Sequence, residues 1–469
     1  MNSFSKASVS DGRAWLLAAT LAASVLASLD LFVVNLAFAS IADSFPGATP
    51  QTMQWILNAY GIVFAALLVP SGRLADRFGR LPLFRFGLIA FAAGSLLAAM
   101  APDISLLIVA RGLQGMGAAL IVPTSLALLL ARHQRQQHKQ MISIWSACGS
   151  VAAAGGPVLG GLLAGYNWRW IFVINVPIAV FALLATASMK KESRQVAHIP
   201  DLVGVALLAV GMATVVTALS YVSDWGLGGW WLWGMVGAGV AALAWFVQRC
   251  RTHASPAVEL RVFAVPSFSV AAVGMAGFYV GFAAMLLGGS LFLTTVWAWS
   301  PLVAGIGFAV GPGMAVVTAL VAGRTRMQPR WLAGLGGGFF VLGGALWFFF
   351  LDENAHYYPV VLLGLMLTGA GAGIAQTGFL AGGVSALPAA AYATGTGVLN
   401  TSRQIGSALG VAALIAITGA GTNAESYRLV WLVLAASGVV GIVSASLIRA
   451  WPQKVGAAAI QALVPAERA

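Results

Sequence analysis

Fourteen apolar segments, each about 20 residues long or longer, constrain the fold more than any other feature of the sequence. A helix needs about 20 residues to cross a bilayer, and these segments are too long and too uniformly apolar for β-barrel strands. Because the count is even, both ends of the chain are expected on one side. We therefore expect an all-α polytopic membrane protein with fourteen transmembrane helices, at residues 14–41, 52–71, 82–101, 104–130, 141–165, 169–189, 202–222, 229–248, 267–295, 302–322, 331–351, 357–382, 394–419 and 427–449.

Charged residues are scarce. The 25 Lys and Arg and the 13 Asp and Glu make up 8% of the 469 residues, and 60% of the chain is apolar. A soluble protein of this size could not cover its surface with so few charges, which excludes a cytosolic enzyme, a disordered chain and a nucleic-acid module. We interpret the net charge of +12 as basic cytoplasmic loops that face anionic membrane lipid.

The basic residues are distributed unevenly over the predicted loops. One set of loops contains 21 of the 25 Lys and Arg residues, and the opposite set contains only Arg169 and Arg428. Positive charge is retained on the cytoplasmic side of membrane proteins, so both termini are predicted to be cytoplasmic. The abundance of Ala, Gly and Trp is typical of a GC-rich bacterium, and we expect the protein in a bacterial cytoplasmic (inner) membrane.

Asp30 is the only acidic residue deep inside a predicted span. It lies about 25 Å from Arg13 and about 20 Å from Asp43 along a helix with a rise of about 1.5 Å per residue. An ionised side chain at that depth costs several kcal/mol unless it faces a wet cavity or a partner. Because burial favours the protonated form of a carboxyl group, Asp30 could bind and release a proton, and its charge could attract a cation. A structural hydrogen bond that locks helices together is the alternative.

Two basic residues also lie inside predicted spans. Arg111 is about 12 Å from the outer face, at a depth similar to that of Asp30. It could act with Asp30 or clamp backbone carbonyl groups. Arg403 lies about 15 Å from the inner face. It could have a functional role, or its side chain could extend toward that face and reach water there.

No pattern in the sequence indicates enzyme chemistry. The five His residues are in loops or near the membrane surface, without metal-ligand spacing or a catalytic dyad. The sequence has no P-loop, so ATP is not expected as the energy source within this chain. We expect no metal, no cofactor and no catalytic residue.

Short motifs resemble a known family. The loop after the second predicted span, Gly72-Arg73-Leu74-Ala75-Asp76-Arg77-Phe78-Gly79-Arg80, closely resembles the loop signature of the major facilitator superfamily. Four further segments are similar to one branch of it, the fourteen-helix drug:proton antiporters of the multidrug-efflux type: Leu29-Asp30-Leu31-Phe32-Val33-Val34-Asn35-Leu36-Ala37, Arg111-Gly112-Leu113-Gln114-Gly115, Gly156-Pro157-Val158-Leu159-Gly160-Gly161 and Asn400-Thr401-Ser402-Arg403-Gln404-Ile405-Gly406.

The resemblance implies a domain organisation and a set of roles. Two six-helix bundles, 1–190 and 263–469, would flank two extra central helices in 191–262 and alternate access to a central cavity. Asp30 would be the proton and cation site, with Arg111 as its electrostatic regulator. The cytoplasmic gate would comprise Gly72, Asp76, Arg77, Gly79 and Arg80, with its two glycines permitting a tight turn, and the antiporter motif would comprise Gly156, Pro157, Gly160 and Gly161.

The resemblance also predicts the function. We expect a monomeric, proton-coupled exporter of lipophilic drugs, biocides or natural products. The amphipathic substrates would be cationic or neutral, because the last six predicted spans contain no acid that would attract a dication. An importer or uniporter of a small metabolite is the alternative, and a transport-inactive sensor or a lipid scramblase is a third class. The side chains that could line the cavity, or else pack or face lipid, are Phe32, Asn35, Trp55, Asn58, Tyr60, Gln114, Trp145, Phe278, Tyr279, Phe282 and Arg403.

Overall fold

The computed structural model describes residues 3–133, 137–187, 189, 199–354, 356–387, 391–419, 421 and 423–448. Within these ranges every regular element is a helix, as expected for an all-α protein. The chain divides into two compact units. The first comprises Met1–Pro200 with Trp299–Ala309, and the second comprises Asp201–Ala298 with Val310–Ala469.

In the first unit, α1 packs along α6 and α8, while α5 packs against both α3 and α4. Small residues let the backbones approach closely. A Cβ atom added to Gly117 of α5 would lie 2.7 Å from the backbone nitrogen of Phe91 in α4. The helices of this unit are α1 (Ser3–Ser44), α2 (Pro50–Met53), α3 (Trp55–Phe78), α4 (Arg80–Ala99), α5 (Ile104–Ala131), α6 (His138–Tyr166), α7 (Trp170–Val173), α8 (Asn175–Thr186) and α13 (Pro301–Phe308).

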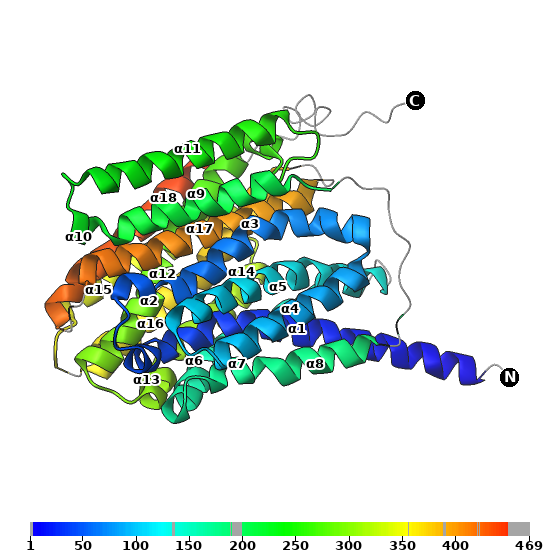
Figure 1. The fold of residues 1–469 in the computed structure, drawn as a ribbon, viewed down its shortest axis with the longest axis horizontal. Helices are drawn as coiled ribbons and strands as arrows, with labels where there is room; N and C mark the ends of the chain where they lie inside the picture. Colours follow the sequence, from blue (N-terminus) through cyan, green and yellow to red (C-terminus); the bar gives the residue numbers. More distant parts are fainter. Residues whose placement is uncertain are drawn as a thin grey trace. The chain divides into compact units, whose positions relative to one another are not determined.

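In the second unit, α12 packs against α17 and α18, and α15 packs against α16 and α18. The helices α9 and α11 form a neighbouring pair (Figure 1). The unit contains α9 (Leu202–Ser220), α10 (Val222–Trp225), α11 (Trp230–Thr252), η2 (Leu260–Ala264), α12 (Pro266–Leu291), η3 (Phe292–Val296), α14 (Val310–Arg324), α15 (Pro329–Phe350), η4 (Tyr357–Leu362), α16 (Leu363–Val384), α17 (Tyr392–Thr418) and α18 (Ala424–Leu447).

Twelve helices in the described part of the chain are long and apolar enough to cross a membrane, two fewer than expected. The predicted span 169–189 corresponds to an apolar helix at Trp170–Thr186, which falls below the length of the other twelve. The predicted span 394–419 corresponds to α17, which has 27 residues but carries polar side chains around Arg403. The number fourteen therefore stays a prediction.

The segment from Gly72 to Arg80 differs from the expected loop. Helix α3 continues to Phe78 and α4 begins at Arg80, so Gly79 alone connects them. Gly79 has φ of 94°, a left-handed conformation that glycine tolerates because it lacks a Cβ atom. The expected turn role is wrong for Gly72, because the chain around it continues as α3 and its backbone hydrogen bonds stay within the helix.

The two compact units also divide the chain differently from the three expected parts. The extra pair α9 and α11, expected as a separate segment in 191–262, groups with the second unit. Residues Trp299–Ala309, expected in the C-terminal bundle 263–469, group with the first unit. The physical reason is the close contact between α13 and α6, where a Cβ on Gly305 would collide with the carbonyl group of Pro157. The assignment of functional domains is not decided by this grouping and stays a prediction.

Candidate functional site

A buried ion pair lies at the centre of the polar contacts in the first unit. Asp30 of α1 and Arg111 of α5 are each 1% exposed, and Arg111 Nη1 lies 2.5 Å from Asp30 Oδ2. The structure thus brings together the two charged residues that the sequence placed at similar depth. A buried pair of this kind is stable only when its remaining donors and acceptors are also satisfied.

Arg111 has further partners around its guanidinium group. Its Nε donates to the backbone carbonyl of Ile56 at 2.8 Å, and its Nη1 also donates to Gln114 Oε1 at 2.8 Å. The guanidinium carbon lies 4.5 Å from the ring centroid of Tyr60 and 5.8 Å from that of Phe172. These aromatic faces add cation–π attraction and leave the group out of contact with water. The expected clamp on a backbone carbonyl and the expected pairing with Asp30 therefore both occur.

Asp30 is held by amide groups as well as by Arg111. Asn175 Nδ2 donates to Asp30 Oδ1 at 3.0 Å, and Gln114 Nε2 lies 3.4 Å from the same oxygen. Gln114 Nε2 also donates to Ser95 Oγ at 2.7 Å. Asn175 Oδ1 is buried without a hydrogen-bond partner among the described residues.

Sequence reasoning missed two members of this cluster, Asn175 and Ser95. Both are fully buried, and both stand in otherwise apolar spans. A buried polar residue in a membrane span is itself a signal that could have identified them. Gln114 was expected in the substrate cavity, yet its side-chain contacts are with the ion pair and with Ser95.

The residues of the expected gate lie at the end of α3 and the start of α4. Gly72 has open space around it, Arg77 is exposed and lies 5.9 Å from the ring of Phe78, and Arg80 is the first residue of α4. The side chain of Asp76 lies outside the described part of the structure. Their role as a cytoplasmic gate stays a prediction.

The four residues of the expected antiporter motif lie on α6, which continues past Pro157 to Tyr166. A Cβ atom on Gly156 would lie 2.7 Å from Cβ of Phe32, and one on Gly160 would lie 2.6 Å from the carbonyl oxygen of Val33. On another side of α6, a Cβ atom on Gly161 would collide with the carbonyl oxygen of Pro301. The glycines thus allow α6 to contact the backbones of both α1 and α13.

The other residues expected near the cavity occupy several environments. In the first unit, Asn58 is buried beside Gln54, Trp145 donates to Ser125 Oγ at 3.2 Å, and Asn35 donates to the carbonyl of Leu31. Phe32 and Trp55 are partly exposed.

In the second unit, Phe278 packs between Phe340 and Phe379 in the aromatic core. Tyr279 packs against Phe282, with the guanidinium group of Arg403 5.7 Å from the Tyr279 ring. Whether the expected residues line a substrate cavity remains a prediction.

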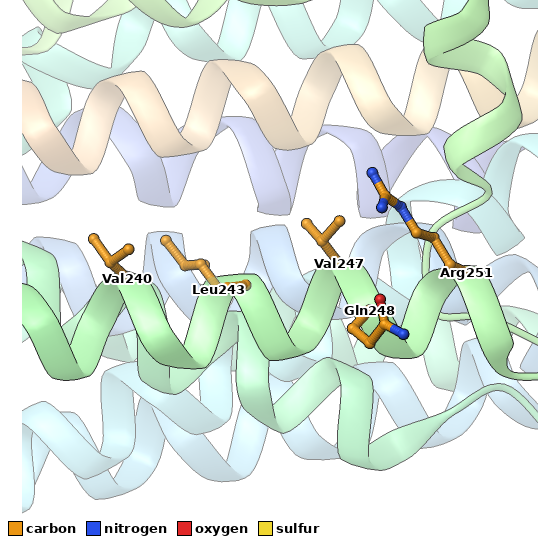
Figure 2. A pocket seen from close by; sticks show the side chains of 6 residues that line it. Val240, Leu243, Val247, Gln248 and Arg251 are labelled. Atoms are coloured by element: carbon orange, nitrogen blue, oxygen red, sulfur yellow. The ribbon is translucent and has the colours of Figure 1, made fainter.

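A shallow groove follows the surface of α11 (Figure 2). Val240, Leu243 and Val247 project from one side of the helix, and Arg251 lies at the end of this row (Figure 2). The remaining lining residues are Ala244 and Gln248. Because one helix supplies the entire lining and none of the expected site residues takes part, we do not assign this groove to the substrate.

Comparisons with known proteins agree with the motifs. A family model described as Major Facilitator Superfamily matches residues 20–411. The chain is 31% identical over 403 residues to the Multidrug resistance protein Stp of Mycobacterium tuberculosis, a match that covers 84% of this chain and 74% of the relative. It is 36% identical over 255 residues to the Putative multidrug resistance protein MdtD of Klebsiella pneumoniae, covering 54% of this chain and 53% of the relative.

Solved structures show the same fold at low sequence identity. A D-xylose-proton symporter matches with a TM-score of 0.66 and 14% identity, covering 94% of this chain and 98% of the symporter. An auto-inhibited peptide transporter of the POT family matches with a TM-score of 0.65 and 15% identity, covering 94% and 97% of the two chains. At this identity the likeness extends to the fold alone.

Proposed function

Because the chain belongs to the Major Facilitator Superfamily, we propose that it is a proton-coupled antiporter that exports lipophilic cationic or neutral compounds by alternating access. The observation that carries this proposal is the buried Asp30–Arg111 pair, an ionisable group in a membrane helix with a defined partner. The relatives named as multidrug resistance proteins support export of drug-like compounds.

The geometry supports a competition between Arg111 and a proton for Asp30. Protonation of Asp30 Oδ2 removes the negative charge that holds Arg111 Nη1, while the Ile56 carbonyl and Gln114 still accept hydrogen bonds from Arg111. We propose that Arg111 contacts Asp30 in one state of the transport cycle and moves away from it in the other, so that Asp30 exchanges Arg111 for a proton between the two states. Such a difference between states is what the exchange of a proton for a substrate requires.

The membrane arrangement is part of the same proposal. The twelve candidate spans, together with Trp170–Thr186 and α17, would make the fourteen transmembrane helices. The 21 basic residues on one set of loops support cytoplasmic termini in a bacterial inner membrane. We further propose that one chain suffices for transport.

A vesicle assay tests the function. In inverted membrane vesicles, the parent protein should accumulate a fluorescent lipophilic cation only when the lumen is made acidic, because protons leaving the lumen drive the cation in. Asp30→Asn should abolish accumulation against the gradient, while the dye can still equilibrate. Asp224→Asn, which changes an exposed acid, is the matched control and should behave as the parent does.

Two outcomes would contradict the proposal. Accumulation by Asp30→Asn at the parent rate would make Asp30 a structural residue. Dye movement that follows only the dye gradient, whatever the pH gradient, would indicate a uniporter.

A further inference from the structure

Three polar side chains converge in the middle of the second unit from three different helices. Tyr279 of α12 donates through its hydroxyl group to Gln376 Oε1 of α16 at 2.8 Å. The guanidinium carbon of Arg403 in α17 lies 5.7 Å from the ring centroid of Tyr279. Tyr279 is 13 residues from the first residue of α12, about 20 Å along the helix, so Arg403 is not extended toward the membrane surface.

Arg403 has no acidic partner among the described residues to balance its charge. Ion pairs among the described residues include those of Arg111 with Asp30, Arg249 with Asp201 and Arg428 with Glu425, and none of these involves Arg403. In the described part of the second unit, the acids lie in connecting segments or in the first turn of a helix. The Nε atom of Arg403 is buried and has no hydrogen-bond partner there. A guanidinium group within a membrane span is costly unless a ligand or a wet cavity compensates its charge.

We propose that Arg403, Tyr279 and Gln376 form a subsite for a carboxylate group of the substrate. The planar guanidinium group suits a planar carboxylate, which could accept from the unpaired Nε. Because Gln376 accepts from Tyr279 through Oε1, its amide nitrogen remains a second donor. This inference rests on the proposed export function and narrows its substrate class to amphipathic zwitterions. Such compounds carry a carboxylate and a cationic group and are therefore neutral overall.

A matched pair of dyes tests the subsite. Rhodamine B carries a free carboxylate and a cationic ring system, whereas its ethyl ester keeps the ring system and lacks the carboxylate. Fluorescence polarisation with the full-length protein in detergent should show that the acid binds about tenfold more tightly than the ester. One hydrogen bond between charged groups accounts for a difference of about this size. Arg403→Gln should bring the affinity for the acid to that for the ester. The ester affinity should stay unchanged, which shows that the variant is folded.

Arg428→Gln is the control, because Arg428 is an exposed arginine of the same unit and should leave the preference intact. Equal affinities of the parent for both dyes, including no binding of either, would overturn the proposal, and so would an equal loss of both affinities in Arg403→Gln. Displacement of the acid by chloride as strongly as by acetate would show a site that does not distinguish a carboxylate from an inorganic anion, and would also overturn the proposal. Failure of the proposed proton coupling can be distinguished from failure of the subsite. Without coupling, the protein would show no uphill transport in vesicles but would still bind the acid more tightly than the ester in detergent.

Discussion

At the scale of single residues, the site is a charge pair whose partners are specific groups rather than bulk water. Arg111 contacts Asp30, Gln114, the Ile56 carbonyl and the Tyr60 ring within one buried region. Removal of one member of such a pair leaves the other charge buried and uncompensated, which costs about 3–5 kcal/mol. Replacement of both members by neutral groups costs much less, because no charge then remains to be desolvated.

A double-mutant cycle on the ion pair follows from this argument. Arg111→Gln alone should lower the free energy of unfolding by about 3 kcal/mol, since it leaves the Asp30 carboxylate buried without its cation. Combination with Asp30→Asn should restore more than half of that loss, while transport against a gradient stays absent. Chemical denaturation in detergent measures both effects. Additive losses in the double variant would show that the two residues do not interact in solution.

At the scale of helices, the contact of α6 with its neighbours depends on the absence of side chains. Gly160 faces the backbone of α1, whereas Gly155 on the same helix has open space around it. The two positions differ in surroundings but share the same secondary structure, so they make a matched pair for substitution.

Gly160→Ala should destabilise the protein by about 1–3 kcal/mol, because the new methyl group would lie 2.6 Å from the Val33 carbonyl oxygen. Gly155→Ala should be neutral or slightly stabilising, since alanine favours a helix over glycine and meets no neighbour. Thermal unfolding of the two variants beside the parent is the measurement. Similar losses at both positions would mean that the α1–α6 contact does not depend on close approach at Gly160.

A second contact between elements involves the segment before α9 and the end of α11. Asp201 accepts two hydrogen bonds from Arg249, at 2.8 Å from Nε and 2.7 Å from Nη2. This pairing holds the pKa of Asp201 below its ordinary value of 3.8. Because the folded-state pKa is the lower one, the stabilisation is complete above the ordinary value and is lost as the pH falls through the folded-state pKa.

Asp201→Asn should therefore lower the melting temperature at pH 7, by an amount that corresponds to about 1 kcal/mol. The difference from the parent should shrink as the pH is reduced below about 4, where Asp201 becomes protonated in the unfolded and then in the folded state. Scanning fluorimetry of both proteins from pH 3 to 7 gives the comparison. A constant difference across that range would rule out titration of Asp201 as its cause.

At the scale of the whole molecule, the proposed topology can be tested by labelling. In a variant with Cys148 and Cys250 replaced by Ser, single cysteines at Gln137 and Thr325 should react only from the cytoplasm. Those at Gly47 and Gly226 should react only from outside, and all four positions are exposed in the structure. The reason is the retention of basic loops in the cytoplasm. An external reporter signal from the C-terminus would eliminate the even count of spans.

The sequence by itself determined that the chain forms membrane-spanning helices and that Asp30 is an acidic residue deep within one of them. Both follow from local properties: about 20 apolar residues suffice to cross a bilayer, and a lone acid among them is costly wherever the helix packs. Fourteen predicted spans coincide with helices, yet Trp170–Thr186 and α17 differ from the rest in length and polarity. The continuation of α3 past Gly72 was missed, because glycine is compatible with both helix and turn.

Only the tertiary structure decided which groups meet. Asn175 is 145 residues from Asp30 along the chain, and Gln376 is 97 residues from Tyr279, yet each pair forms a hydrogen bond. A sequence pattern indicates how deep a residue lies in its helix, but not which way the helix is turned or which helix lies beside it. The partners of Asp30 and Arg403 depend on those rotations and neighbours, which the packing of many side chains determines together.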